Sequence, residues 1–210
     1  MKVISKKHKT ASRAPPLLVV ISGPSGAGKD ATIAKLKESG YLFHYVVTVT
    51  TRPKRPGEID RVHYRFISDE QFQKIVGTKK LLEWAKVYNN YYGVPKDEVK
   101  KALNSGQDVI VKVDVQGATT LKRIIPEAIF IFLVPASMEE LTERLNQRNN
   151  HQSASDLKLR LNKAKEEMEI LSPFDYCVVN PKNNIGLTVS KIHAILSAEK
   201  CRVNPRVMKL

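Results

Sequence analysis

One segment near the start of the sequence, Gly23-Pro-Ser-Gly-Ala-Gly-Lys29, limits the possible folds most strongly. It follows the apolar run at residues 17–21 and precedes DATIAKLKE, which has helical spacing. In a glycine-rich turn between a strand and a helix, backbone N–H groups can point at phosphate oxygens, and the helix N-terminus adds a partial positive charge. A lysine at the end of such a turn reaches the β- and γ-phosphates of a nucleoside triphosphate. We therefore predict a phosphate-binding loop formed by Gly23, Pro24, Ser25, Gly26, Ala27, Gly28 and Lys29.

Asp30 follows the lysine, where such loops carry a serine or threonine whose hydroxyl binds Mg²⁺. A carboxylate oxygen also suits this hard cation, either directly or through water. Alternatively, the acid only stabilises the N-terminus of the helix and has no metal role. Both interpretations stay open at this point, so Asp30 is a candidate Mg²⁺ ligand, and Ala31 is the last residue of the predicted triphosphate site.

Short apolar runs alternate with helical patterns from residue 17 onward. The runs are LLVVI, DVIVKVD, AIFIFLV and DYCVVN. They are continuously apolar, as expected of strands that are covered by helices on both faces. The alternation predicts an α/β fold of three layers around a central parallel sheet. A chain of 210 residues with 42% hydrophobic residues is long enough for one domain with a single substantial core.

Three segments depart from this pattern. Residues 48–97 contain arginines, prolines and shorter strands, which indicates an inserted subregion. Residues 149–155 form a polar stretch that resembles a mobile flap. Residues 1–16 carry five lysines and arginines and no acid, which is typical of a disordered basic arm. The arm is either a solvated tail or an organellar address.

The formal net charge of +14 favours anionic partners without choosing among them. No apolar run reaches the roughly 18–20 residues that a membrane-spanning helix needs. The two cysteines and five histidines are scattered, so neither a disulfide framework nor a zinc site is predicted.

Several motifs occur in an order that resembles the guanylate kinases, and the resemblance covers residues 17 to about 200. They are the loop GPSGAGK, then TTRPKRPGEIDRVHY, LLEWAKVYNNYYG, VDVQG, RLNQR with Arg160, and DYCVVN. Members of that family transfer the γ-phosphoryl group of ATP to GMP with magnesium. The resemblance implies a P-loop kinase fold with a core (17–47, 98–144 and 159–210), an NMP-binding region (48–97) and a short LID (145–158).

The predicted acceptor site lies mostly in the inserted subregion. Arg52 and Arg55 flank a Pro-Lys pair, and two guanidinium groups at this spacing suit a dianionic phosphate, although a solvated basic loop would look the same. Glu83 lies in an otherwise apolar strand, where it is either a functional carboxylate or an exposed edge residue. The resemblance implies that Glu83 binds the guanine N1–H and exocyclic amine. It also implies GMP contacts from Thr48, Arg52, Arg55, Tyr64, Tyr92, Val94 and Asp114.

The predicted donor and transfer residues lie nearer the C-terminus. Arg144 and Arg148 are four residues apart and share a helix face, and taken alone they would be ordinary surface arginines. The resemblance implies that Arg148 and Arg160 close over the transferring phosphoryl group, that Arg144 is part of the ATP site, and that Asn180 contacts adenine. The implied catalytic set is Lys29, Arg55, Arg148 and Arg160.

Three residues differ from the usual pattern of this family: Asp30, Val94 and Lys112. Together they are similar to the plastid and mitochondrial type of guanylate kinase and to related bacterial sequences. They leave open whether dGMP or IMP is also used. The expected substrates are ATP and GMP, with no specific nucleic acid and no membrane partner, and monomer and homodimer both remain open. We expect a cytoplasmic protein, or a plastid or mitochondrial one if the arm is an address.

Three other functions are weighed against this one. A kinase for another nucleoside monophosphate would share the loop but would not need Glu83. A guanylate kinase-like interaction module without catalysis would not need Lys29, Arg148 and Arg160. A nucleic-acid-binding protein would explain the basic arm, but no recognition motif of interleaved basic and aromatic residues is visible.

Overall fold

The structure, a computed structural model, describes residues 14–87, 89–148 and 154–210. Its strands are β1 (Leu18–Ser22), β2 (Phe43–Tyr45), β3 (Val49–Thr50), β4 (Arg65–Phe66), β5 (Leu81–Val87), β6 (Asn90–Pro95), β7 (Asp108–Lys112), β8 (Ile129–Pro135) and β9 (Tyr176–Asn180). Its helices are α1 (Lys29–Glu38), α2 (Asp69–Gly77), α3 (Lys96–Asn104), α4 (Val115–Ile124), α5 (Met138–Arg148), α6 (Ala154–Glu169) and α7 (Ile185–Lys200).

The main sheet has the strand order β2-β7-β1-β8-β9, and all its neighbouring strands are parallel. The chain first builds the β7 side of β1 and then crosses to the β8 side, so the strand order reverses at β1. In open α/β sheets, ligands bind at such a reversal, beyond the carboxyl ends of the strands. The predicted phosphate-binding loop follows β1 directly and therefore lies at this point.

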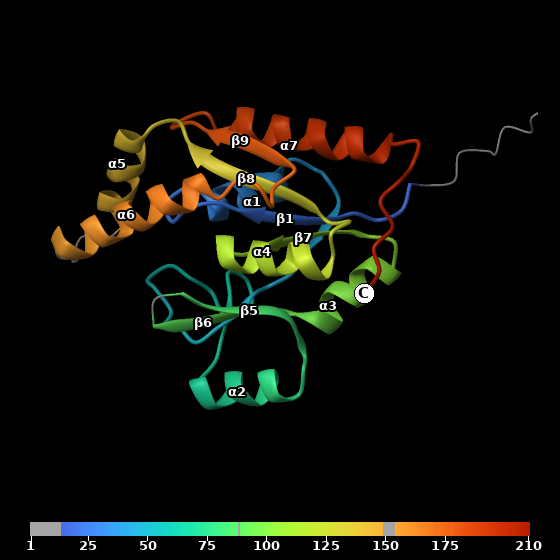
Figure 1. The fold of residues 1–210 in the computed structure, drawn as a ribbon, viewed down its shortest axis with the longest axis horizontal. Coiled ribbons are helices and arrows are strands. Elements are labelled where there is room, and N and C mark those ends of the chain that lie inside the picture. The colour runs from blue at the N-terminus through green and yellow to red at the C-terminus, as the bar shows by residue number, and fades with distance from the viewer. Residues whose placement is uncertain (1–13, 88, 149–153) are drawn as a thin grey trace, which may run out of the picture.

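Helices cover both faces of the main sheet, as Figure 1 shows for α7 on one side and α4 on the other. Alternate residues of β1 enter two different cores. Val19 packs on the face covered by α1 and α7, together with Ile33 and Ile192. Val20 packs on the opposite face, in a core to which α3 and α4 contribute. The three-layer α/β fold predicted from the apolar runs is confirmed.

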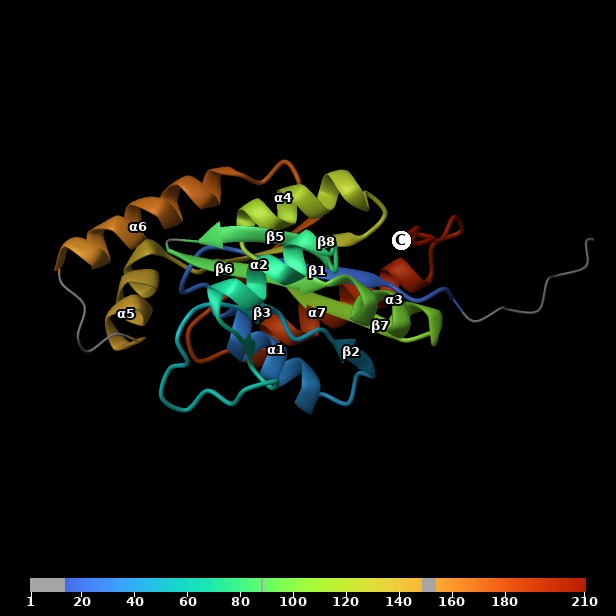
Figure 2. The same ribbon diagram turned by 90° about the horizontal axis from the view of Figure 1, so that it is seen from below.

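A smaller sheet of order β4-β3-β6-β5 lies beside the main one, with α2 beyond it (Figure 1). Strands β5 and β6 form an antiparallel pair, and β5 also packs against α4 of the main unit. Figure 2 shows α5 and α6 extending away from the body at the end of the molecule opposite α3. The strands of this smaller sheet come from residues 49–95, and the predicted polar flap falls partly on residues 149–153, outside the described residues.

Strand β2 was not predicted from the sequence, because it has three half-buried residues, Phe-His-Tyr, and no continuous apolar run. Strand β9 is less buried than its apolar sequence implies, since it is an edge strand with Val179 39% exposed. Residues 1–13 of the basic arm lie outside the described residues. Within the part that is described, no helix combines the length and the apolarity needed to cross a lipid bilayer.

Candidate functional site

A cavity of about 940 Å³ opens at the carboxyl ends of β1 and β7, between the main sheet, the small sheet and α6. It brings together most of the residues predicted from the sequence, although they are spread over more than 150 positions. Those that line it are Gly23, Ser25, Gly26, Gly28, Lys29, Asp30, Ala31, Thr48, Arg52, Arg55, Tyr64, Glu83, Tyr92, Asp114, Arg144, Arg160 and Asn180.

The loop between β1 and α1 has the geometry of a phosphate cradle. Gly23 and Gly28 have φ values of +143° and +90°, which side chains of L-residues rarely adopt. A Cβ atom on Gly23 would lie 2.2 Å from the carbonyl oxygen of Leu133, and one on Gly28 would lie 2.3 Å from Nδ2 of Asn180. The loop is therefore confined between β8 and β9, and these two positions accept glycine alone.

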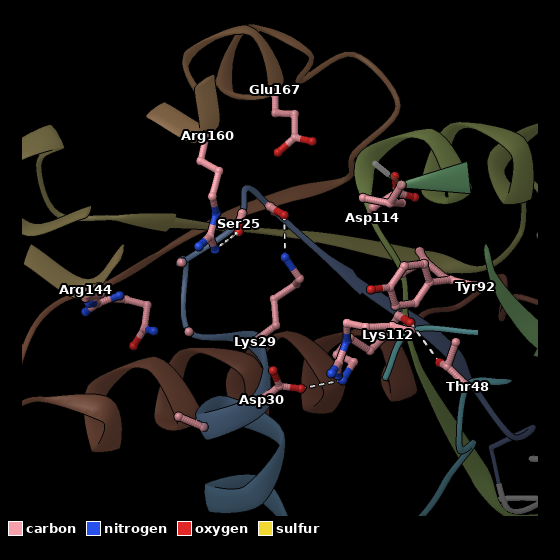
Figure 3. Close-up of a pocket in the computed structure, with 18 of the residues that line it drawn as sticks. Ser25, Lys29, Asp30, Thr48, Tyr92, Lys112, Asp114, Arg144, Arg160 and Glu167 are labelled. Atoms are coloured by element: carbon pink, nitrogen blue, oxygen red, sulfur yellow. Dashed lines mark hydrogen bonds and ion pairs between the residues drawn. The ribbon is translucent and has the colours of Figure 1, made fainter. Parts of the chain in front are cut away.

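Lys29 begins α1 and folds back over the loop. Its Nζ donates to the carbonyl oxygens of Gly23, at 2.6 Å, and Pro24, at 3.1 Å (Figure 3). Burial lowers the pKa of this lysine, although the neighbouring Glu167 and Asp30 act in the opposite direction. An ammonium held at the rim of the cradle is placed to meet phosphate oxygens.

Three polar residues from α5, α6 and β9 surround the loop. Arg160 is 8% exposed, and its guanidinium donates to Oγ of Ser25 at 2.8 Å. Arg144 donates to the carbonyl oxygen of Asn180 at 2.9 Å and pairs with Glu140. Figure 3 shows Arg160 pointing from α6 toward the loop, with Glu167 from the same helix beside it.

Asn180 is engaged by the protein itself. Its Nδ2 donates to the carbonyl oxygen of Ala27 at 2.8 Å, and its Oδ1 accepts from Thr188 at 2.9 Å. Asn180 is 3% exposed, so these bonds tie the loop to β9 and α7. Its side chain is first of all a support for the loop.

On the other side of the cavity, a buried guanidinium is already paired. Arg52 is 9% exposed, and its two terminal nitrogens donate to the carboxylate of Glu58 at 3.0 and 2.7 Å. The same carboxylate accepts from the backbone N–H of Arg55 at 2.8 Å. Burial alone would raise the pKa of Glu58, but these partners outweigh it and lower the value. Tyr64 lies against this pair, with its ring 5.3 Å from the Arg52 guanidinium carbon.

Two carboxylates at the floor of the cavity have unsatisfied oxygens. Glu83 is 4% exposed, and its Oε1 has no hydrogen-bond partner among the described residues. Asp114 uses Oδ1 to cap α4 through the Gly117 N–H at 2.9 Å, whereas its Oδ2 is buried without a partner in the described part of the chain. Burial, together with the charge of Asp114, raises the pKa of Glu83 to about 8. Buried polar atoms normally have partners, so this pair indicates a ligand with hydrogen-bond donors.

The cavity thus contains an anion cradle, a buried arginine on each of its two sides (Arg160 and Arg52), and two carboxyl groups at its floor. A model of one protein family, described as guanylate kinase, matches residues 16–199. The chain belongs to the guanylate kinase family.

Relatives of known name support this membership over nearly the whole chain. A guanylate kinase of Desulfitobacterium hafniense is 46% identical over 89% of this chain and 92% of its own length. "Guanylate kinase 2, chloroplastic/mitochondrial" of rice, Oryza sativa subsp. japonica, is 43% identical over 93% of this chain and 68% of its own length. A crystal structure of guanylate kinase from Anaplasma phagocytophilum superposes with a TM-score of 0.75 at 30% identity, covering 91% of this chain and 89% of that one.

Three residues named in the sequence analysis, Val94, Pro24 and Ala27, are described and do not line the cavity. Val94 is fully buried in the core beneath it, paired across the small sheet with Glu83. Pro24 and Ala27 contribute carbonyl oxygens to the internal bonds of the loop. Arg148 ends α5, and its side chain lies outside the described residues.

Several cavity and near-cavity residues were not among the predicted site residues, and they include the charged residues Glu58, Lys112 and Glu167. Glu58 pairs with Arg52 six positions away, which a loop sequence does not indicate. Lys112 was noted as an unusual residue but was given no role. Glu167 could have been found from the sequence, because it lies seven residues after Arg160 and so shares its helix face.

Proposed function

We propose that this guanylate kinase family member transfers the γ-phosphoryl group of ATP to GMP, giving ADP and GDP. The observation that carries the acceptor assignment is the buried Glu83 carboxyl group with its unpartnered Oε1. Guanine offers N1–H and an exocyclic amine side by side, and one carboxylate can accept from both. Adenine, cytosine and uracil do not present such a donor pair to a single carboxylate.

The remaining proposed acceptor contacts are supported by residues that line the same cavity. Arg52 and Arg55 are proposed to bind the GMP phosphate, with Tyr64 and Tyr92 beside it and Asp114 near the reacting phosphates. Thr48 is proposed as a further polar contact, although its hydroxyl already donates to the carbonyl oxygen of Lys112 at 3.2 Å. Val94 is proposed to act only from below, by shaping the floor under the base.

The donor triphosphate is proposed to lie on the loop at residues 23–31, with Arg144 and Asn180 toward the adenine. The acceptor phosphate is already a nucleophile at neutral pH, since its second pKa is about 6, so no general base is needed. Lys29, Arg55, Arg148 and Arg160 are proposed to offset the charge of the in-line transition state. We also propose that residues 48–97 and 145–158 close over the core at 17–47, 98–144 and 159–210 and exclude water.

Magnesium enters this proposal as part of the donor, the magnesium complex of ATP. Asp30 is a poor direct ligand, because its Oδ1 is paired with the ammonium group of Lys112. Among the described residues, no group of three or more His, Cys, Asp or Glu side chains is suited to a metal. Mg²⁺ keeps several waters and binds mainly to substrate phosphates at such sites, so we propose that Asp30 contacts it at most through water.

The raised pKa of Glu83 makes GMP binding depend on pH. In the free protein the carboxyl group is protonated below about pH 8, whereas guanine donors require the carboxylate. Binding must therefore release a proton, and affinity for GMP should rise by up to about tenfold per unit between about pH 6.5 and 8, then level off. Calorimetry in buffers with different ionisation enthalpies would measure the released proton. In Glu83→Gln the dependence should shrink to that of the GMP phosphate; an unchanged dependence would assign the proton to another group.

The direct test is ADP formation from Mg-ATP with GMP, dGMP, IMP, AMP or UMP offered separately. GMP should be the fastest acceptor, and IMP, which keeps N1–H but lacks the amine, should be slower. AMP and UMP should be slower by about 10²-fold or more, as expected when buried polar groups lose their partners. Faster turnover with AMP or UMP would overturn the guanine assignment, and no ADP with any acceptor would favour a non-catalytic module.

For location we propose the cytoplasm, with a plastid or mitochondrion as the alternative. The alternative is supported by the basic residues 1–16 and by the name of the rice relative. A fluorescent fusion of the whole chain, compared with one lacking residues 1–16, separates the two.

A further inference from the structure

Lys112 is a buried lysine that the proposed reaction does not yet use. It ends β7 and is 4% exposed. A buried ammonium is unfavourable unless it is paired. Here it forms an ion pair with Asp30, and its Nζ lies 4.0 Å from the centre of the Tyr64 ring.

These contacts keep the lysine charged. Burial by itself lowers the pKa of Lys112, but Tyr64, Tyr45 and Asp30 raise it, and the net effect is a raised value. Lys112 therefore acts as a fixed positive charge. Figure 3 shows it between Asp30 and the residues of the acceptor side.

Lys112 touches both halves of the cavity. Strand β7 pairs with β1, and Lys112 is opposite Ile21, two residues before the phosphate-binding loop. Its side chain reaches Asp30 in the first turn of α1, next to Lys29. On the acceptor side it contacts the Tyr64 ring, and its carbonyl oxygen accepts from Thr48 at 3.2 Å. Lys112 thus contacts Asp30, next to the phosphate-binding loop. It also contacts Tyr64 and Thr48, both of which are proposed to bind GMP.

Asp30 needs such a partner if the loop is to bind a polyanion. An acid in the first turn of α1 adds negative charge where the helix N-terminus and Lys29 must attract phosphates. The ammonium of Lys112 cancels that charge locally. The hydroxyl residue usual at this loop position would need no such compensation, so the lysine and the aspartate form one functional unit.

We propose that Lys112 is a positioning residue of the transfer reaction, which neutralises Asp30 beside the donor phosphates and holds the Tyr64 ring in the acceptor site. The inference rests on the proposed function, because it assumes ATP on the loop and GMP beside Tyr64. The two substrates should respond differently to substitutions. ATP binding should depend on the balance of charge between Lys112 and Asp30, whereas GMP binding should depend on the ammonium group of Lys112 itself.

The test uses Lys112→Met, Asp30→Asn and the double variant. Lys112→Met removes the ammonium group from beside Asp30 and from the Tyr64 ring, so the KM for ATP should rise about tenfold and the KM for GMP about fivefold. In the double variant the charge is again balanced but the cation under Tyr64 is still missing. Its KM for ATP should therefore return to within about twofold of the starting protein, whereas its KM for GMP should stay raised.

A matched control comes from Lys122, which makes the same two kinds of contact away from the cavity. Its Nζ pairs with Asp175 at 2.9 Å and lies 4.6 Å from the centre of the Phe130 ring. Lys122→Met should leave both KM values unchanged. Dissociation constants for GMP and for a non-hydrolysable ATP analogue, measured by calorimetry, should follow the same pattern as the KM values.

The outcomes separate the inference from the function it rests on. If the unaltered protein makes no ADP with GMP, the proposed function fails before any variant is compared. If it is active and Lys112→Met lowers thermal stability but changes neither KM, the pair is purely structural and the inference is overturned. If Lys112→Met does not fold, the double variant, in which the Asp30 charge is also removed, decides: an unchanged KM for GMP there also overturns the inference.

Discussion

Replacing Arg160 with alanine should lower kcat for GMP phosphorylation by about 10³-fold, the low end of the range for a transition-state arginine. The guanidinium is 8% exposed and donates to Ser25 in the phosphate-binding loop, which holds it beside the proposed path of the transferred group. Its charge counts most in the transition state, where negative charge spreads over the equatorial oxygens. The KM for GMP should therefore change by less than about threefold. Steady-state ADP formation at saturating ATP measures both quantities.

Two further variants define what the Arg160 result means. Arg160→Lys keeps the charge but loses the planar fork, so it should recover only part of the rate. Lys165→Ala removes an exposed cation from the same helix and should leave kcat unchanged. A kcat for Arg160→Ala within threefold of the starting value, in a protein with normal thermal unfolding, would remove Arg160 from the mechanism.

Glu83→Gln should lower kcat/KM for GMP by about 10³-fold. Two hydrogen bonds to a carboxylate contribute about 1.5–3 kcal/mol each, and the new amide N–H₂ would face the guanine donors. The loss should appear mainly in KM, because base recognition is the same in the ground state and the transition state. Initial rates over a range of GMP concentrations give the ratio.

Unfolding should not explain the Glu83→Gln result. Since the pKa of Glu83 is about 8, its carboxyl group is already neutral in the free protein at pH 7, and an amide of the same shape replaces it at little cost. Glu38→Gln, on the exposed surface of α1, serves as a charge-matched control that should keep full activity. Equal kcat/KM values for GMP in Glu83→Gln and Glu38→Gln would show that Glu83 does not read the base.

Much of the fold could be predicted because burial on both faces leaves a clear pattern. Strands β1, β7 and β8 have continuously apolar centres, and segments with helical patterns follow them, so the parallel sheet could be predicted directly. Strand β2 is too short and too polar to give such a signal, and its place in the sheet depends on pairing with β7. Pairing across long sequence separations is not encoded in any local pattern.

The parts of the site whose chemistry depends on residue type could be predicted from the sequence. The parts that depend on contacts between side chains could not. The glycine loop is recognisable because phosphate binding needs those residues at that spacing, whereas the roles of the arginines came from the resemblance to guanylate kinases. The sequence does not show which of these side chains already have hydrogen-bond or ion-pair partners within the protein. Glu58 already pairs with Arg52, and Thr188 with Asn180, so both predicted ligand contacts are also internal ones. The position of Val94 in the core, under Glu83, likewise depends on strand register.

The Arg52–Glu58 pair has a consequence for which anions the cavity retains. A free, buried guanidinium would attract any small anion in the cell, including chloride and inorganic phosphate. Here both terminal nitrogens of Arg52 are held by a carboxylate of the same chain. In the proposed acceptor site, Glu58 is thus an internal competitor, and an incoming anion must displace it or share the arginine with it. A monoanion should bind Arg52 little better than the Glu58 carboxylate does. The dianionic phosphate of a nucleotide carries more charge and is also held through its base, so it can displace Glu58.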